Sequence, residues 1–87
     1  MSLVTAQYAL GTAATQVAGP DVMAQFVTIH NDNSNQQVFV GNESVTINSG
    51  FHIDGKEEHT FTLYPGDSLY AVSAGSDNVS VIIQKQK

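Results

Sequence analysis

The sequence predicts an all-β protein, a small antiparallel β-sandwich or a jelly-roll-like barrel. Val, Ile and Thr gather in short runs throughout the 87 residues, and these residue types favour strands. Gly, Asn, Asp and Ser separate the runs, as the turns between short strands require. About seven to nine short strands at this spacing are typical of two packed sheets.

The first expected strand covers residues 3–10, where apolar and polar side chains alternate. Its apolar side carries Val4, Ala6, Tyr8 and Leu10. This two-residue period indicates a half-buried strand. A second short strand is expected over residues 14–18, and the segment 19–21 ends it because Pro20 lacks a backbone donor.

The middle of the chain holds the densest strand signals. Residues 26–30 and 38–40 are rich in Val, Ile and Phe, and the polar residues 31–35 lie between them. Two such runs joined by Asn, Asp and Ser predict a β-hairpin with a loop of about five residues. Residues 45–47 and 51–53 are expected to form short strands, followed by a tight turn at Asp54-Gly55.

The last third of the chain predicts three further strands, over residues 59–63, 68–74 and 79–84. Pro65-Gly66-Asp67 separates the first two of them. Pro at the second position and Gly at the third fit a type II turn. A polar loop over residues 75–78 joins the last two strands.

Composition argues against several classes of protein. The chain has eight acids, three lysines and no arginine, so it lacks the clustered cations that nucleic-acid binding requires. It has no cysteine, which excludes disulfides and Cys-based zinc sites. No apolar run approaches the roughly 20 residues of a membrane helix, and no secretory signal is recognisable, so we expect synthesis in the cytoplasm.

Few residues offer catalytic or metal-binding chemistry. The candidates are His30, His52, His59, Asp54, Glu57, Glu58 and Asp67. None falls into a spacing such as H-E-x-x-H, and no G-x-S-x-G turn is present. We therefore expect no enzymatic activity, no metal and no cofactor, and interpret these side chains as solvated turn residues.

The first twenty residues differ from the rest in charge. Residues 1–20 carry no charged side chain, whereas all acids and lysines lie within residues 21–87. We expect residues 21–87 to form the β-sandwich domain. Residues 1–20 are either its first strands or an N-terminal arm that pairs with a neighbouring subunit, since uncharged strands are prone to pair at their open edges.

Three strands carry apolar residues at consecutive positions, which indicates cover on both faces. A two-layer domain covers one face of each strand, so we expect Phe26, Phe39 or Ile82 to contact a symmetry mate, most simply in a homotrimer. Together with the first strand, the interface candidates are Val4, Ala6, Tyr8, Leu10, Phe26, Phe39 and Ile82.

Several segments resemble small structural proteins of tailed bacteriophages. They are Val27-Thr28-Ile29-His30-Asn31, Val38-Phe39-Val40-Gly41, Gly50-Phe51-His52-Ile53, and Thr60-Phe61-Thr62-Leu63 followed by residues 64–72. The resemblance covers residues 24–84. It is closest to β-sandwich proteins that decorate or cement the phage head, and to related modules of head or tail fibres. The matched positions are turn and core residues, and the first twenty residues depart from the pattern.

The resemblance implies a capsid decoration protein on the outer surface of the virion, with the major capsid protein as its partner and a homotrimer as its usual state. An alternative is a receptor- or glycan-binding module of a phage head or tail fibre. In that case His52, His59 and Tyr64 are the candidate glycan contacts. A subunit of the head-to-tail connector is a third reading.

Overall fold

The computed structural model describes residues 2–85, which form eight strands and no helix. The strands are β1 (Ser2–Leu10), β2 (Thr15–Ala18), β3 (Gln25–Asn31), β4 (Val38–Gly41), β5 (Phe51–Ile53), β6 (Glu58–Leu63), β7 (Leu69–Ser73) and β8 (Asp77–Lys85). Within this part of the chain, no helix is long and apolar enough to cross a membrane.

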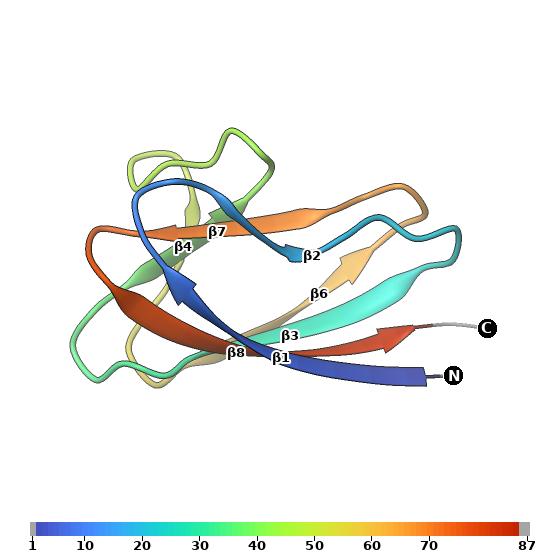
Figure 1. Ribbon diagram of the computed structural model, residues 1–87, viewed down its shortest axis with the longest axis horizontal. Helices are drawn as coiled ribbons and strands as arrows, with labels where there is room; N and C mark the ends of the chain where they lie inside the picture. Colours follow the sequence, from blue (N-terminus) through green and yellow to red (C-terminus); the bar gives the residue numbers. More distant parts are fainter. Residues whose placement is uncertain (1, 86–87) are drawn as a thin grey trace.

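The strands form two four-stranded antiparallel sheets that pack face to face (Figure 1). Sheet A has the order β1-β8-β3-β6, and sheet B has the order β2-β7-β4-β5. This is the strand order of an eight-stranded jelly roll. The predicted all-β class, a small antiparallel sandwich of jelly-roll type, is confirmed.

The core lies between the sheets and consists mostly of aliphatic side chains. In β3, buried and half-buried residues alternate without interruption, and β8 alternates in the same way along most of its length. Sheet A contributes Leu10, Val27, Ile29, Leu63, Val79, Val81 and Ile83, and sheet B contributes Val17, Ala18, Val38, Val40, Ile53, Leu69 and Ala71. Tyr8 and Phe61 pack against this core while remaining partly exposed.

The hairpin predicted for residues 26–40 is wrong. β3 pairs with β6 and β8 in sheet A, whereas β4 pairs with β5 and β7 in sheet B. The segment between them carries the chain from one sheet to the other. This crossing allows the apolar sides of β3 and β4 to face each other across the core, which a flat hairpin would not achieve.

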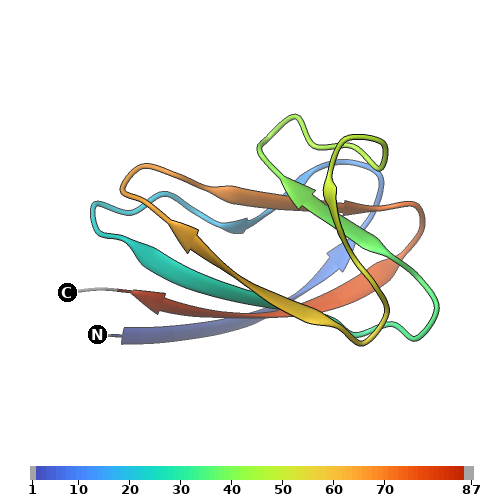
Figure 2. The ribbon, with the colours of Figure 1, turned by 180° about the vertical axis from the view of Figure 1, so that it is seen from behind.

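The short strand predicted for residues 45–47 is also absent. Residues 42–50 form a loop of turns that rises above β4 on the outer side of sheet B (Figure 2). Ser49 donates its backbone N–H to the Thr46 carbonyl at 3.1 Å, which closes one of these turns. Val45 is buried within the loop and lies against Gly41 and Gly50.

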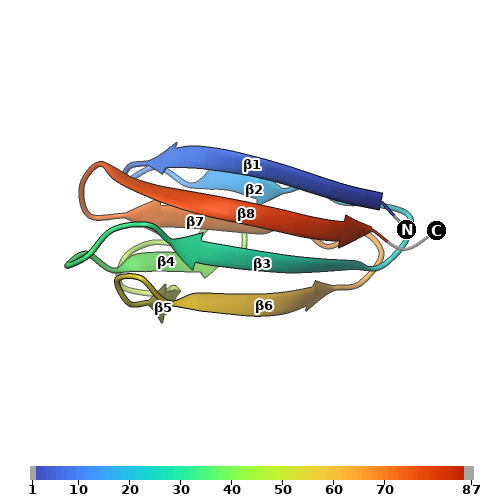
Figure 3. The same ribbon diagram turned by 90° about the horizontal axis from the view of Figure 1, so that it is seen from below.

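The first twenty residues form strands of both sheets. β1 pairs with β8 in an unbroken register from Ser2 opposite Lys85 to Leu10 opposite Asp77. β2 pairs with β7 and contains an irregularity between Gln16 and Ala18. The structure therefore places residues 2–18 at the same side of the sandwich, as the outermost strands of the two sheets (Figure 3).

Two turns show how glycine is used. Gly66 has a φ of 89° and the Asp67 N–H donates to the Tyr64 carbonyl, so the predicted type II turn is confirmed. In the turn after β5, the positive φ belongs to Lys56, at 65°, and not to Gly55. Gly55 is required there for another reason, because a Cβ would lie 2.3 Å from the Ser34 carbonyl oxygen.

Candidate functional site

The outer face of sheet A is a regular surface formed by four neighbouring strands. The strand register arranges its side chains in three rows of four, each row crossing β1, β8, β3 and β6 in that order. The rows are Leu3-Gln84-Phe26-Thr62, Thr5-Ile82-Thr28-Thr60 and Gln7-Ser80-His30-Glu58. We call these twelve residues the outer face. Only Glu58 among them carries a formal charge.

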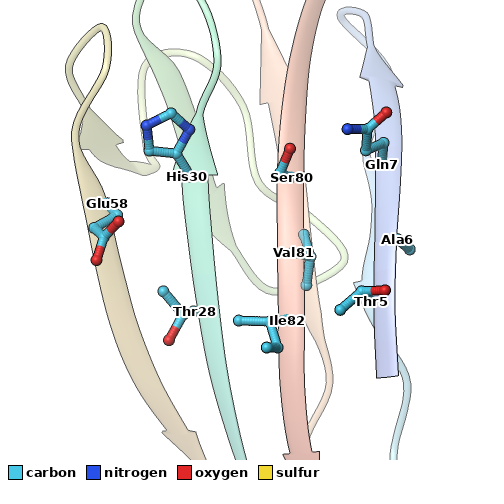
Figure 4. A pocket seen from close by; sticks show the side chains of 9 residues that line it. All are labelled: Thr5, Ala6, Gln7, Thr28, His30, Glu58, Ser80, Val81 and Ile82. Atoms are coloured by element: carbon cyan, nitrogen blue, oxygen red, sulfur yellow. The ribbon is translucent and has the colours of Figure 1, made fainter. Parts of the chain in front are cut away.

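A groove with a volume of about 470 Å³ crosses the second and third rows (Figure 4). Hydroxyl and amide side chains line it, and Ile82 provides its main apolar side chain. Thr28 and Thr60 share a hydrogen bond of 2.8 Å beside it, which fixes their hydroxyls. The groove therefore combines hydrogen-bonding groups with an apolar centre, and Glu58 is the one formally charged side chain that lines it.

One end of the groove holds the only titratable network on this face among residues 2–85. Nδ1 of His30 lies 2.6 Å from Oδ1 of Asp32, and the Ser80 hydroxyl donates to Oδ2 of Asp32 at 2.8 Å. Burial raises the pKa of the Asp32 carboxyl, but the hydrogen bonds from His30 and Ser80 outweigh it. The pKa consequently lies below its usual value.

This network does not have the geometry of a catalytic triad. In a triad the imidazole lies between the hydroxyl and the carboxylate, whereas here the Asp32 carboxylate lies between His30 and Ser80. Within residues 2–85, no three His, Asp or Glu side chains gather as metal ligands would. The arrangement serves to hold the third row in place.

A second surface lies at the end of the sandwich where β1 begins and β8 ends. The Lys85 ammonium lies 3.4 Å from the Asp21 carboxylate, and the Gly66 N–H donates to the Asp21 carbonyl, which brings two loops to this end. Five of the eight exposed large apolar side chains of residues 2–85 lie here: Leu3, Val4, Val22, Met23 and Tyr64. We call this group the apolar end.

A third surface lies along the border between β5 and β6. Phe51 is 53% exposed, and its ring packs edge-on against His59 and Phe61, with centroids 5.2 and 6.0 Å away. His52 is stacked on Phe51 at 6.3 Å. We call these four residues the aromatic edge. Gln37 and His52 both hydrogen-bond the Asp54 carboxylate, which lowers the pKa of that group.

The candidate glycan contacts are only partly brought together. His52 and His59 meet at the aromatic edge through Phe51. Tyr64 follows β6 at the opposite end of that strand from His59 and belongs to the apolar end. The three residues therefore do not form one site.

The interface candidates of β1 divide along the strand. Val4, Ala6, Tyr8 and Leu10 share the inward side, as the alternation predicted, but their exposure differs. Val4 is 42% exposed because it lies near the open end of the sandwich, whereas Leu10 is 2% exposed in the core. Leu10 is thus not available as an interface residue.

The other interface candidates lie on opposite sides of the molecule. Phe26 and Ile82 belong to the outer face of sheet A. Phe39 points to the outer side of sheet B, opposite Val72, where the loop of residues 42–50 lies over it. Part of its second cover thus comes from the chain itself, so Phe39 depends less on a partner than Phe26 and Ile82 do.

Sequence reasoning missed the apolar end and the role of Phe51. Val22 and Met23 stand next to the turn residues 19–21 and belong to no periodic pattern, and Leu3 falls on the polar side of the alternation over residues 3–10. For Phe51 the sequence predicted only a place in the short strand of residues 51–53, and not its contacts with His59 and Phe61. The rows of the outer face depend on which strands are neighbours, which the sequence does not encode locally.

The structure belongs to the class of jelly-roll sandwiches. Its particular features are the grooved outer face, with Glu58 as the one charged side chain, and the apolar end. No protein-family model and no curated protein matches the sequence. A solved structure of Bacillus endospore appendages, described as disulfide-linked pili, contains a chain with a similar fold. The TM-score is 0.60 at 7% sequence identity, and the match covers 99% of this chain and 87% of that chain. This similarity concerns the fold alone.

Proposed function

We propose that this chain is a virion structural protein that decorates the outer surface of a tailed-phage head and stabilises contacts between capsomers. The observation that carries the proposal is the outer face. Its twelve aligned side chains include one charged group, Glu58, and three large apolar ones, Leu3, Phe26 and Ile82. Apolar and aromatic side chains with few charges among them are typical of the centre of a protein interface.

The size of the outer face favours a multivalent mechanism. Four strands about 4.8 Å apart and three rows about 7 Å apart cover roughly 400 Å². A standard interface buries about 800 Å² on each partner, so one copy binds the major capsid protein weakly. Several linked copies gain avidity without any new kind of contact, and the homotrimer expected from the sequence is one such arrangement.

The fold and the charge are compatible with this role. Jelly rolls recur in viral capsid domains, so the fold is compatible with a shell protein. The structural neighbour belongs to appendages described as pili, so a similar fold serves there as part of a large protein assembly. The net charge of −5 would keep decorated particles apart in solution.

The test is binding to phage heads that lack the protein, followed by electron cryomicroscopy of the complex. The wild-type chain is expected to bind in many copies, and Ile82→Asp is expected to weaken binding at least tenfold because it places a charge at the centre of the outer face. Ala74→Asp adds the same charge in the exposed turn after β7 and should bind as the wild type does.

Two results would contradict the proposal. One is a copy number far below that of the shell protein. The other is bound density in which sheet B, and not the outer face of sheet A, contacts the shell.

The aromatic edge supports a second candidate, a glycan-binding module of a head or tail fibre. An exposed phenyl ring beside imidazole, carboxylate and amide groups offers both a stacking surface and hydrogen-bonding groups. A glycan array is the test. Phe51→Ala is expected to abolish specific binding if this function is correct, whereas Tyr64→Ala, which lies apart, serves as the control.

A further inference from the structure

Each sheet of the sandwich has two outermost strands, and they differ greatly in length and regularity. In sheet B these are β2, with four residues and an irregular register, and β5, with three residues. In sheet A they are β6, with six residues including Glu58, and β1, with nine. β1 is the longest edge in the described part of the chain.

β1 also lacks the features that keep edge strands from pairing. Natural sheets protect their edges with charges, prolines, bulges or a covering loop. β1 contains no charge and no proline, and its register with β8 has no bulge. Within residues 2–85, no backbone hydrogen bond outside the β1–β8 ladder involves residues 2–9. Every second residue of this nine-residue strand therefore turns its N–H and C=O to the free side, away from β8.

We propose that this edge pairs with the same edge of a second copy, antiparallel across a two-fold axis, to give one continuous eight-stranded sheet. The register that uses all nine residues is centred on Ala6. It places Thr5 opposite Gln7 of the second copy and Val4 opposite Tyr8. Outward residues meet outward residues and inward residues meet inward ones, so the two outer faces become continuous.

The side chains of β1 are compatible with this register. Val4 is an inward-facing residue that is nevertheless 42% exposed, and Tyr8 is half-buried on the same side. Directly opposite each other, they form an aromatic and β-branched cross-strand pair, a type that stabilises antiparallel sheets. Leu3, which is 61% exposed, lies opposite Ala9, whose small side chain leaves room for it.

Charge identifies the occupant as a second copy of this chain. Two molecules that each carry a net charge of −5 repel one another over most approaches. The first twenty residues carry no charge, so the β1 edge is the long edge where two copies can meet without opposing like charges. An isologous pair also closes on itself and does not grow into a fibre.

The pairing replaces the homotrimer expected from the sequence with a two-fold dimer, and its consequence for capsid binding rests on the proposed function. Two outer faces joined in one sheet present roughly 800 Å², the area that a standard interface buries on each partner. A two-fold pair would then contact two capsomers across the joint between them. The pairing itself does not require a capsid and can be tested on the isolated chain.

The first experiment measures mass and register. Sedimentation equilibrium of the full chain is expected to give a species of twice 9.3 kDa. The chain has no cysteine, so Ala6→Cys introduces a single thiol at the two-fold axis, and mild oxidation should give a covalent dimer. Ala9→Cys, on the same strand, faces Leu3 of the second copy and should give no covalent dimer under the same conditions.

The second experiment separates loss of pairing from loss of folding. The double variant Thr5→Lys, Gln7→Lys places lysines opposite each other across the axis and should be monomeric. The variant Thr5→Glu, Gln7→Glu should be monomeric for the same reason, while an equimolar mixture should restore the dimer through opposite charges. Circular dichroism of each variant checks that the sandwich is intact.

Three outcomes would overturn the pairing: a monomeric wild type at 100 µM, a trimer, or folded charge variants that do not combine. None of these outcomes affects binding of the outer face to phage heads. Conversely, a dimer with no affinity for any head would leave the pairing intact and remove the proposed function.

Discussion

Asn31 is a buried polar residue whose hydrogen bonds hold the crossing from sheet A to sheet B. Its side-chain amide donates to the carbonyls of Gln36, at 2.7 Å, and Ile53, at 3.0 Å. Its oxygen accepts from the backbone N–H and the side chain of Asn33. One side chain thus connects the end of β3, the following turn and β5.

We expect Asn31→Ala to destabilise the fold by about 2–4 kcal/mol, because it leaves two or more buried polar groups without partners. Urea denaturation followed by circular dichroism measures the change. Asn35→Ala in the same turn is the control, since Asn35 is exposed, and it should change the stability by less than about 0.5 kcal/mol. A loss below about 1 kcal/mol for Asn31→Ala would contradict the structural role.

The Asp32 carboxylate makes the free energy of unfolding depend on pH in the acid range. Its pKa lies below the usual 3.8 in the folded protein, so the folded state binds the proton less readily than the unfolded chain. The stability that the carboxylate contributes is present above pH 3.8 and is lost as the pH falls through the lower folded value. His30 and Ser80 are the hydrogen-bonding partners responsible.

Asp32→Asn is therefore expected to be less stable than the wild type at pH 7, by about 1 kcal/mol, and the difference should shrink below pH 3.8. Ser80→Ala removes one of the two donors and should show a smaller difference of the same sign. Urea midpoints measured between pH 2 and pH 7 check both variants. A difference that stays constant over this range would show that the carboxylate charge is not involved.

At the scale of single elements, the loop of residues 42–50 depends on a glycine. A Cβ at Gly50 would lie 2.7 Å from Cβ of Phe39 and 2.8 Å from Cγ2 of Val45. Both atoms are held in a packed layer over β4. Gly50→Ala should consequently cost about 1–3 kcal/mol, as overpacking does elsewhere.

Gly75→Ala is the matched control for this loop. A Cβ at Gly75 meets nothing within 4 Å, and its φ does not fall in the left-handed region. The substitution should leave the stability unchanged or raise it slightly, since alanine restricts the unfolded chain. Thermal unfolding compares the two variants, and equal melting temperatures would show that the loop does not pack on Phe39.

Strands could be predicted from the sequence because their signals are local. The run of Phe, Val, Thr and Ile over residues 26–29 marks a strand whichever neighbours it has. Pairing could not be predicted in the same way, and the expected hairpin was wrong because a polar turn serves equally well between paired strands and between sheets. Residues 45–47 combine two β-branched apolar residues with Thr46, yet the hydrogen bonds of Thr46 with Ser49 favour a turn.

For the candidate surfaces, too, single residues could be predicted from local signals, whereas their arrangement depended on strand pairing. Phe26 and Ile82 could be singled out as apolar residues on the wrong side of their strands, and both lie on the outer face. Their alignment with Leu3 and Thr5 required the register of β1 on β8, which joins the two ends of the chain. Cover of Phe39 by the loop of residues 42–50 could not be foreseen, because these residues carry a strand signal and not a sign of how the chain folds back over β4.

For the whole molecule, the distribution of charge sets how two copies approach each other. The first strand and the outer face are nearly neutral, while the acids lie in the turns and along other borders. Neighbouring strands lie about 4.8 Å apart, so two four-stranded sheets joined edge to edge have their centres about 19 Å apart. Their net charges then act over a distance comparable with the Debye length in dilute salt.

Dimer formation should therefore strengthen as salt is added. Two net charges of −5 about 19 Å apart repel by roughly 3 kcal/mol with a Debye length of about 30 Å and by roughly 0.5 kcal/mol with one of about 8 Å. The dimer dissociation constant is expected to fall at least tenfold between 10 mM and 150 mM salt, as sedimentation equilibrium would measure. An interface built from opposite charges would weaken over the same range, so a dissociation constant that rises with salt would place the contact somewhere other than the uncharged β1 edge.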